Sequence, residues 1–199
     1  KNDLGAQCLG LYEKEILDLF SDKGPFDTFL DIGAADGYYA IGMLHAQMAK
    51  RAICFEASEK GRLAIKDNWL TNNSVGELEI KGEADEASIV KIASELTAKS
   101  LVLIDIEGFE FSLLTPNVIS RLSECQLIIE IHNWVENFSF KYKTLLTNLD
   151  LHFEVQAIEF TDRNTQSIPL LRSYTDDNRL LVTSERRPCL MRFLHLVPR

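Results

Sequence analysis

Two pairs of ionisable residues stand where two apolar segments of the chain end. The first segment runs into Asp105 and Glu107, and the second runs into Glu130 and His132. Residues two apart lie on the same side of an extended chain, so each pair shares one side of its strand. Buried charges are costly without a partner or a purpose, and we therefore expect chemistry here. His132 or Asp105 can act as a general base, and Glu107 is the third candidate catalytic residue.

The same groups are an alternative metal site. Carboxylate oxygens and an imidazole nitrogen suit Mg²⁺ or Mn²⁺, and such an ion would polarise a hydroxyl group and lower its pKa. The ligands in this alternative are Asp105, Glu107, Glu130 and His132. Zinc fits less well, because the four cysteines form no C-x-x-C pair and none of them stands in these segments.

A glycine-containing turn upstream predicts a ligand site. An apolar segment reaches Asp31, turns through Gly33 and Gly37, and continues with helical spacing. Ala35 takes the place of the glycine that admits a pyrophosphate in dinucleotide-binding turns. A second apolar segment ends on Glu56, 19 residues after Gly37, which is close to the separation expected for a ribose-binding carboxylate. The sequence therefore predicts a site for a nucleoside-type ligand without phosphates.

The elements that position these residues alternate between strands and helices. Strands are expected near 27–32, 52–56, 76–81, 101–106, 126–132, 153–160 and 179–183. A helix at 9–22 precedes them, and further helical patterns separate the early strands. This order predicts a doubly wound, mostly parallel Rossmann-like α/β sheet of about seven strands with an antiparallel C-terminal pair. The polar segment 161–177 is either a lid or a solvated loop, and the apolar tail after residue 188 either packs on the sheet or forms a homodimer contact.

Length and charge restrict the classes of protein. The 199 residues are 46% hydrophobic, enough for one sizeable core. We expect a single domain over 1–199, with a cofactor-binding half at 27–100 and a substrate-side half at 101–199. The net charge of −9 and the lack of a long Lys/Arg run predict no nucleic-acid partner. The pattern also predicts no membrane contact, a cytoplasmic location and either a monomer or a homodimer.

The blocks described above resemble the class I S-adenosylmethionine-dependent methyltransferases, and within them the FkbM-like group. The segments DIGAADGYYAIG, CFEAS, IDIEGFEFSLL and IIEIHN match that group in order, over roughly residues 10–185. The resemblance implies that S-adenosylmethionine is the cofactor, with its methionine end near the glycine turn, its ribose on Glu56 and its adenine amine near Glu83. The implied cofactor residues are Asp31, Gly33, Ala35, Asp36, Gly37, Glu56, Ala57, Glu83, Ala84 and Asp105.

The resemblance also implies methyl transfer to an acceptor that faces Asp105, Glu107 and His132. A hydroxyl oxygen of a small molecule or a glycan is the favoured acceptor, and nitrogen or a carboxylate stays open. The first alternative is a nicotinamide-dependent oxidoreductase, which Ala35 and the lack of a suitably placed Tyr-x-x-x-Lys pair disfavour. A non-catalytic cofactor-binding subunit is the second. Nucleic-acid methylation is disfavoured by the acidic balance and by the lack of an Asn/Asp-Pro-Pro-Tyr motif.

Overall fold

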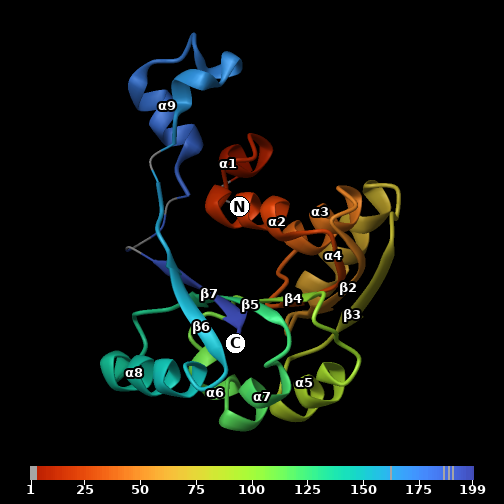
Figure 1. Ribbon diagram of the computed structural model, residues 1–199. Coiled ribbons are helices and arrows are strands. Elements are labelled where there is room, and N and C mark those ends of the chain that lie inside the picture. The colour runs from red at the N-terminus through yellow and green to blue at the C-terminus, as the bar shows by residue number, and fades with distance from the viewer. Residues whose placement is uncertain (1–3, 162, 186, 188, 190) are drawn as a thin grey trace.

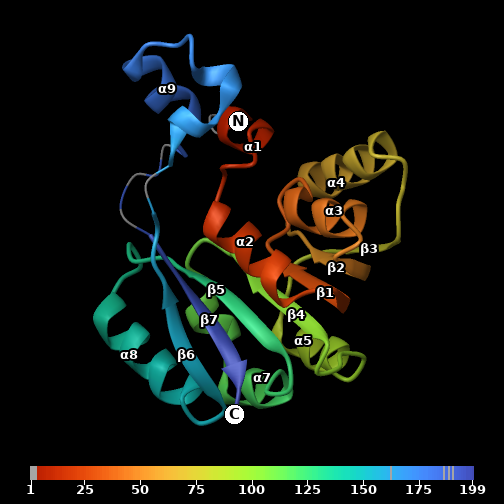
Figure 2. The same ribbon diagram turned by 45° about the horizontal axis from the view of Figure 1, so that its top comes forward.

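The fold is a seven-stranded mixed sheet between two layers of helices (Figures 1 and 2). The computed structural model describes residues 4–161, 163–185, 187, 189 and 191–199. The strands lie in the order β3-β2-β1-β4-β5-β7-β6. Their bounds are β1 Phe26–Ile32, β2 Ala49–Phe55, β3 Glu77–Lys81, β4 Ser100–Ile104, β5 Gln126–Ile131, β6 Phe153–Ile158 and β7 Arg192–Pro198. β1 to β5 pair in parallel, whereas β7 runs antiparallel between β5 and β6. This confirms the predicted fold class.

Two hydrophobic cores hold the helices on the sheet. On one face, α2 (Lys14–Lys23), α3 (Tyr38–His45) and α4 (Glu59–Thr71) pack through side chains such as Phe20, Met43 and Ile65. On the other face lie α5 (Glu86–Ala93), α6 (Glu110–Leu113), α7 (Pro116–Arg121) and α8 (Phe138–Leu149). The central strands β4 and β5 are buried except at Gln126 and are rich in Val, Ile and Leu, which is the pattern of a parallel sheet covered on both sides.

The strand order places a crevice at the centre of the sheet. The chain proceeds from β1 to β2 and β3 on one side, and then returns to place β4 and β5 on the other side of β1. In such a sheet the connections after β1 and β4 leave in opposite directions, and ligands bind beyond the carboxyl ends of the strands at this point. The turn after β1 and the loop after β4 therefore meet where the sequence predicts a site.

The C-terminal part differs from its prediction in one element. Residues 179–183 belong to helix α9 (Asp176–Thr183) and not to a strand. The Thr175 hydroxyl caps the first turn by accepting from the backbone N–H of Asn178, and two aspartates in that turn favour the helix dipole. The last strand is instead β7, so the apolar tail packs back on the sheet as one of the two alternatives predicted.

The segment between β6 and β7 forms a small lobe that stands out from the body (Figure 1). It contains the short 3₁₀ turns Thr165–Ser167 and Pro169–Leu171 in addition to α9. The lobe contacts α1 (Leu4–Cys8) so closely that a Cβ on Gly5 would lie 2.3 Å from the carbonyl oxygen of Val182. The helix predicted at 9–22 is α2, which begins at Lys14.

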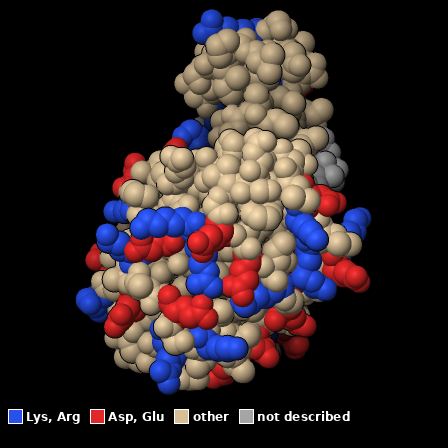
Figure 3. Space-filling model, turned by 90° about the vertical axis from the view of Figure 1, so that its right-hand side faces the viewer, with Lys and Arg blue, Asp and Glu red and all other residues tan. Residues whose placement is uncertain are grey.

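The distribution of charged side chains and the hydropathy of the helices are relevant to the predicted lack of nucleic-acid and membrane partners. Figure 3 shows acidic and basic side chains interspersed over the body, below a lobe with few charges. Within the described residues, no helix is both long enough and apolar enough to cross a membrane.

Candidate functional site

The turn after β1 is shaped by close contact with the end of β4. Gly33 has a φ of 96°, which side chains rarely adopt, and a Cβ there would lie 1.7 Å from the carbonyl oxygen of Asp105. The N–H groups of Gly33 and Ala34 both donate to the carbonyl oxygen of Phe55 at the end of β2. The glycine therefore lets three strand ends converge around one crevice.

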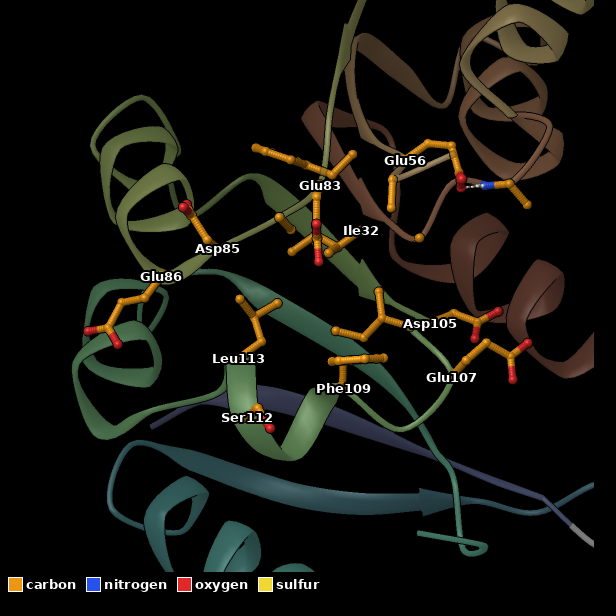
Figure 4. Close-up of a pocket in the computed structure, with 16 residues that line it drawn as sticks. Ile32, Glu56, Glu83, Asp85, Glu86, Asp105, Glu107, Phe109, Ser112 and Leu113 are labelled. Carbon is orange, nitrogen blue, oxygen red and sulfur yellow. Dashed lines mark hydrogen bonds between the residues drawn. The ribbon is translucent and has the colours of Figure 1, made fainter. Parts of the chain in front are cut away.

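Glu56 holds the turns after β1 and β2 together. Its carboxylate accepts hydrogen bonds from the backbone N–H of Ala35 (2.9 Å; Figure 4) and of Ser58 (2.8 Å). A Cβ on Gly61 of α4 would lie 2.6 Å from the Glu56 side chain, so helix and carboxylate are in close contact. Glu56 stands where the sequence places a ribose-binding carboxylate, and its oxygens are oriented by backbone donors.

A cavity of about 540 Å³ opens at these strand ends, which is within the usual range for small-ligand pockets. Apolar side chains such as Phe55, Ile106 and Leu113 form much of its wall, and Figure 4 shows Glu56 and Glu83 on the side opposite Phe109 and Leu113. The predicted cofactor residues on the wall are Gly33, Ala35, Glu56, Ala57, Glu83, Ala84 and Asp105. None of the described residues of the lobe between β6 and β7 lines the cavity. In this conformation the segment 161–177 therefore does not cover the site as a lid.

Three other predicted cofactor residues lie outside the cavity wall, namely Asp31, Asp36 and Gly37. Gly37, with a φ of 83°, begins α3 and faces Ile41 and Ile65. The Asp31 side chain is 2% exposed and bonds to the backbone of Ala40, while its Oδ2 has no hydrogen-bond partner. Burial raises the pKa of Asp31 to about 7. Asp31 and Gly37 thus support the turn from behind.

The two ionisable pairs at the ends of β4 and β5 meet around His132. Its Nε2 lies 3.5 Å from Asp105 Oδ1, 3.7 Å from Glu107 Oε2 and 3.6 Å from Glu130 Oε2. Glu107 has a φ of 55° in the turn that carries its carboxylate toward the ring. Asp105, Glu107 and His132 offer donor atoms within 4.8 Å of one another, which is a geometry that could hold a metal ion.

Glu110 orients His132 and was not assigned a role from the sequence. This fully buried carboxylate accepts from the backbone N–H groups of His132 (2.9 Å) and Gly108 (2.9 Å), and it lies 3.2 Å from His132 Nδ1. A carboxylate only accepts, so Nδ1 carries the hydrogen and Nε2 faces the other three carboxyl groups. Burial would lower the pKa of His132, but the bond to Glu110 raises it above its ordinary value.

A buried network of ion pairs lies beside this group, on the side of Glu130, and the sequence analysis did not predict it. Arg187 contacts the carboxylates of Glu13 and Glu130, and its Nε lies 2.7 Å from Glu185. Burial, followed by the charge of Glu130, raises the pKa of Glu13 to about 7. Burial and the Glu130 carboxyl likewise raise the pKa of Asp105 well above its ordinary value. Glu13, Glu130 and the neighbouring pair Glu185 and Arg187 come from three distant parts of the chain, and no local pattern marks their meeting.

Comparisons with known proteins agree on the fold. No family model and no curated protein sequence matches this chain. Among solved structures, M. capricolum TrmK in complex with S-adenosylhomocysteine has a TM-score of 0.56 at 12% identity over 91% of this chain. The B. subtilis M1A22 tRNA methyltransferase TrmK has a TM-score of 0.54 at 9% identity over 92%. Methyltransferase FkbM from Methylobacillus flagellatus has a TM-score of 0.54 at 16% identity over 87%.

The alignments cover 66% and 64% of the two TrmK chains and 44% of the FkbM chain, so each of these proteins contains parts without a counterpart here. The chain shares the Rossmann-like α/β fold of these methyltransferase structures. The FkbM structure, with a TM-score of 0.54, superimposes no better than the TrmK structures at 0.56 and 0.54, and the comparisons therefore do not single out the FkbM-like group.

The predicted partners need a correction. The sequence analysis assigned a small-molecule or glycan acceptor and no nucleic acid, but the neighbours of this fold include a tRNA methyltransferase. The exclusion of nucleic acid is therefore wrong. Its physical weakness is that net charge is summed over the whole chain, whereas an acceptor meets only the surface around the cavity. The lack of an Asn/Asp-Pro-Pro-Tyr motif is equally weak evidence against a nucleic-acid acceptor, because such a motif is specific to certain families and not to the fold.

Proposed function

We propose that this protein is an S-adenosylmethionine-dependent methyltransferase. The observation that carries the proposal is the charge of the cavity wall. Among its described residues the wall has six carboxyl side chains and neither Lys nor Arg; the six are Glu56, Glu83, Asp85, Glu86, Asp105 and Glu107. The cofactor is a sulfonium cation without phosphates, so it suits this wall, whereas the pyrophosphate of a nicotinamide dinucleotide would be repelled.

The residues on the wall also fit the parts of the cofactor. Glu56 would accept from the two ribose hydroxyls, and Glu83 would lie near the adenine amine. The apolar side chains of Phe55, Ile106 and Leu113 would contact the adenine and ribose. Gly33 lets the backbone approach the methionine end. The order of the sequence motifs supports the same assignment, including its likeness to the FkbM-like group.

The acidic group around His132 would serve the acceptor. Methyl transfer is an in-line displacement, and positioning the two reactants can account for about 7–11 kcal/mol of the barrier. An acceptor that carries a proton must lose it, and Asp105, Glu107 and His132 are the groups proposed to receive the proton or to stabilise the resulting charge. Asp105 and Glu107 line the cavity, whereas the His132 side chain is 1% exposed and acts from behind them.

RNA is the acceptor class that the structural neighbours favour. Two aromatic side chains next to the acidic group are exposed, Phe109 by 66% and Trp134 by 49%, and the Trp134 ring lies 4.8 Å from the His132 ring. Exposed aromatic faces of this kind stack on unpaired nucleobases. The proposal is that such a base is presented to the sulfonium methyl group.

Ligand binding and label transfer test the two parts separately. Isothermal titration calorimetry should detect S-adenosylhomocysteine binding to the wild type and no binding of NAD. Binding of NAD but not of S-adenosylhomocysteine would refute the methyltransferase assignment. Tritium from methyl-labelled S-adenosylmethionine should appear in bulk tRNA. If the protein binds the cofactor but labels no RNA, the RNA acceptor is refuted while the cofactor assignment stands.

A further inference from the structure

We propose that Asp105, Glu107 and His132 bind one hard divalent cation, for which Mn²⁺ is the best probe. The binding site does not rest on the proposed function, although its use in the reaction would. The three donor atoms come from two neighbouring strand ends and lie within 4.8 Å of one another. An octahedral ion with ligands at about 2.1 Å has adjacent donors about 3 Å apart and opposite donors about 4.2 Å apart. The separations of 3.5 and 3.7 Å from Nε2 to the two carboxylates are slightly wider, so small inward shifts would complete the site.

His132 is already oriented as a metal ligand. Its Nδ1–H faces the buried Glu110 carboxylate, which is the usual arrangement behind metal-bound histidines because it fixes the ring and its tautomer. Nε2 therefore faces the carboxyl groups of Asp105, Glu107 and Glu130 at 3.5–3.7 Å, and a bound ion would take the lone pair that a proton otherwise holds there. A buried nitrogen aimed in this way points to a cation, and it distinguishes the site from an ordinary group of acidic side chains.

Of the carboxyl groups around His132, those of Asp105 and Glu107 lack a compensating basic side chain among the described residues. Arg187 contacts Glu13 and Glu130 and so compensates the rear of the group. By contrast, no described Lys or Arg lies within ion-pair distance of Asp105 or Glu107. With an ion bound in place of their protons, the two carboxylates and a neutral imidazole would balance its charge. Oxygen ligands with one nitrogen favour Mn²⁺ or Mg²⁺ over softer ions.

The proposed metal site is open toward the cavity, from which an acceptor would approach. The Glu107 side chain is 77% exposed, and both carboxylates line the cavity. An ion held by three protein ligands would keep its remaining positions for water or for an acceptor atom, and would lower the pKa of either. Glu130 faces Nε2 at 3.6 Å from the arginine side and completes the enclosure.

Electron paramagnetic resonance of free Mn²⁺ tests the proposal on the full chain after treatment with a chelator. We expect one bound ion per chain, at least tenfold weaker binding in Glu107→Gln, and weaker binding in Glu110→Gln through the freed His132 ring. Mg²⁺ should displace the bound Mn²⁺. Glu107 is exposed, so its substitution should leave the melting temperature nearly unchanged and should report on binding alone.

Glu86→Gln is the matched control, because it removes a carboxylate from the same cavity wall at the end away from Glu107 (Figure 4). It should bind Mn²⁺ as the wild type does. The proposal is overturned if the folded wild type binds no Mn²⁺ at 1 mM, or if Glu86→Gln weakens binding as much as Glu107→Gln. It is also overturned if an excess of Mg²⁺ cannot displace the bound Mn²⁺. None of these results depends on cofactor binding or on methyl transfer.

Discussion

Replacing Asp31 by Asn should stabilise the protein at alkaline pH, although Asp31 supports the cofactor turn. The side chain is 2% exposed, and its Oδ2 has no partner. Burial raises its pKa from an ordinary 3.8 to about 7. Since each pKa unit corresponds to 1.36 kcal/mol, holding this carboxylate ionised in the native state costs about 4 kcal/mol at pH 8.

The sign follows from the raised pKa. The native state binds the Asp31 proton more tightly than the unfolded chain does, so the favourable contribution is fully present below about pH 4 and is lost as the pH rises to about 7. Between pH 5 and pH 8 the loss is about 3 kcal/mol. Asn carries no charge, but its amide N–H₂ would stand where Oδ2 lacks a partner, which costs about 1–3 kcal/mol. The variant should therefore gain about 1–3 kcal/mol over the wild type at pH 8 and none at pH 5.

Urea denaturation at the two pH values measures this difference directly. The comparison of variant with wild type removes the pH dependence of other groups, such as Glu13 and Asp105. Asp27→Asn is the control, because Asp27 lies in the same strand, is partly exposed and pairs with Lys50 at 2.6 Å. It should show no gain at pH 8. If the free energy of unfolding differs between Asp31→Asn and the wild type by the same amount at pH 5 and pH 8, the pKa of Asp31 is not raised in the native state and the reasoning is refuted.

Three further outcomes follow from the site. Glu56→Ala should weaken S-adenosylhomocysteine binding by about 1.5–3 kcal/mol through the lost charge-assisted hydrogen bonds, and unchanged affinity in calorimetry would remove Glu56 from the site. Gly33→Ala should lower the free energy of unfolding by more than about 2 kcal/mol, because its φ is 96° and its Cβ would lie 1.7 Å from a carbonyl oxygen; an unchanged urea midpoint would contradict this. Asp105→Asn should reduce the rate of methyl transfer by about 10²–10⁴-fold with cofactor affinity nearly intact, and a variant that loses both equally would place Asp105 in cofactor binding instead.

The sequence was most informative where the determinants are local. Strands β1, β4 and β5 are recognisable in the sequence as mostly apolar segments, and the turn after β1 is marked by Gly33 and Gly37. The error over residues 179–183 was also local, because an apolar run outweighed the Thr175 cap and the acidic first turn that follow helix rules. The tail was recognised as apolar but not as strand β7, since only its pairing with β5 and β6 decides its conformation.

The environment of His132 could be predicted only in part. Its meeting with Asp105, Glu107 and Glu130 follows from two adjacent parallel strands ending at the same edge of the sheet. Glu110 could have been found, since it begins a short helix directly after the acidic turn, but nothing in its spacing shows that it reaches back to the next strand. Glu13 and Arg187 lie 174 positions apart in the chain, and their ion pair depends on the packing of both chain ends.

The contrast between whole-chain charge and local charge explains both the successful and the failed part of the functional prediction. A net charge of −9 says little about an acceptor, and the exclusion of nucleic acid built on it was wrong. The cavity wall, in contrast, concentrates six carboxyl groups without a described cation, and only the fold reveals this because they come from the ends of β2, β3 and β4 and from the start of α5. Such a concentration selects for positive ligands at close range. The proposed sulfonium cofactor along the wall and the proposed divalent ion at Asp105, Glu107 and His132 would both be attracted by this concentration of negative charge.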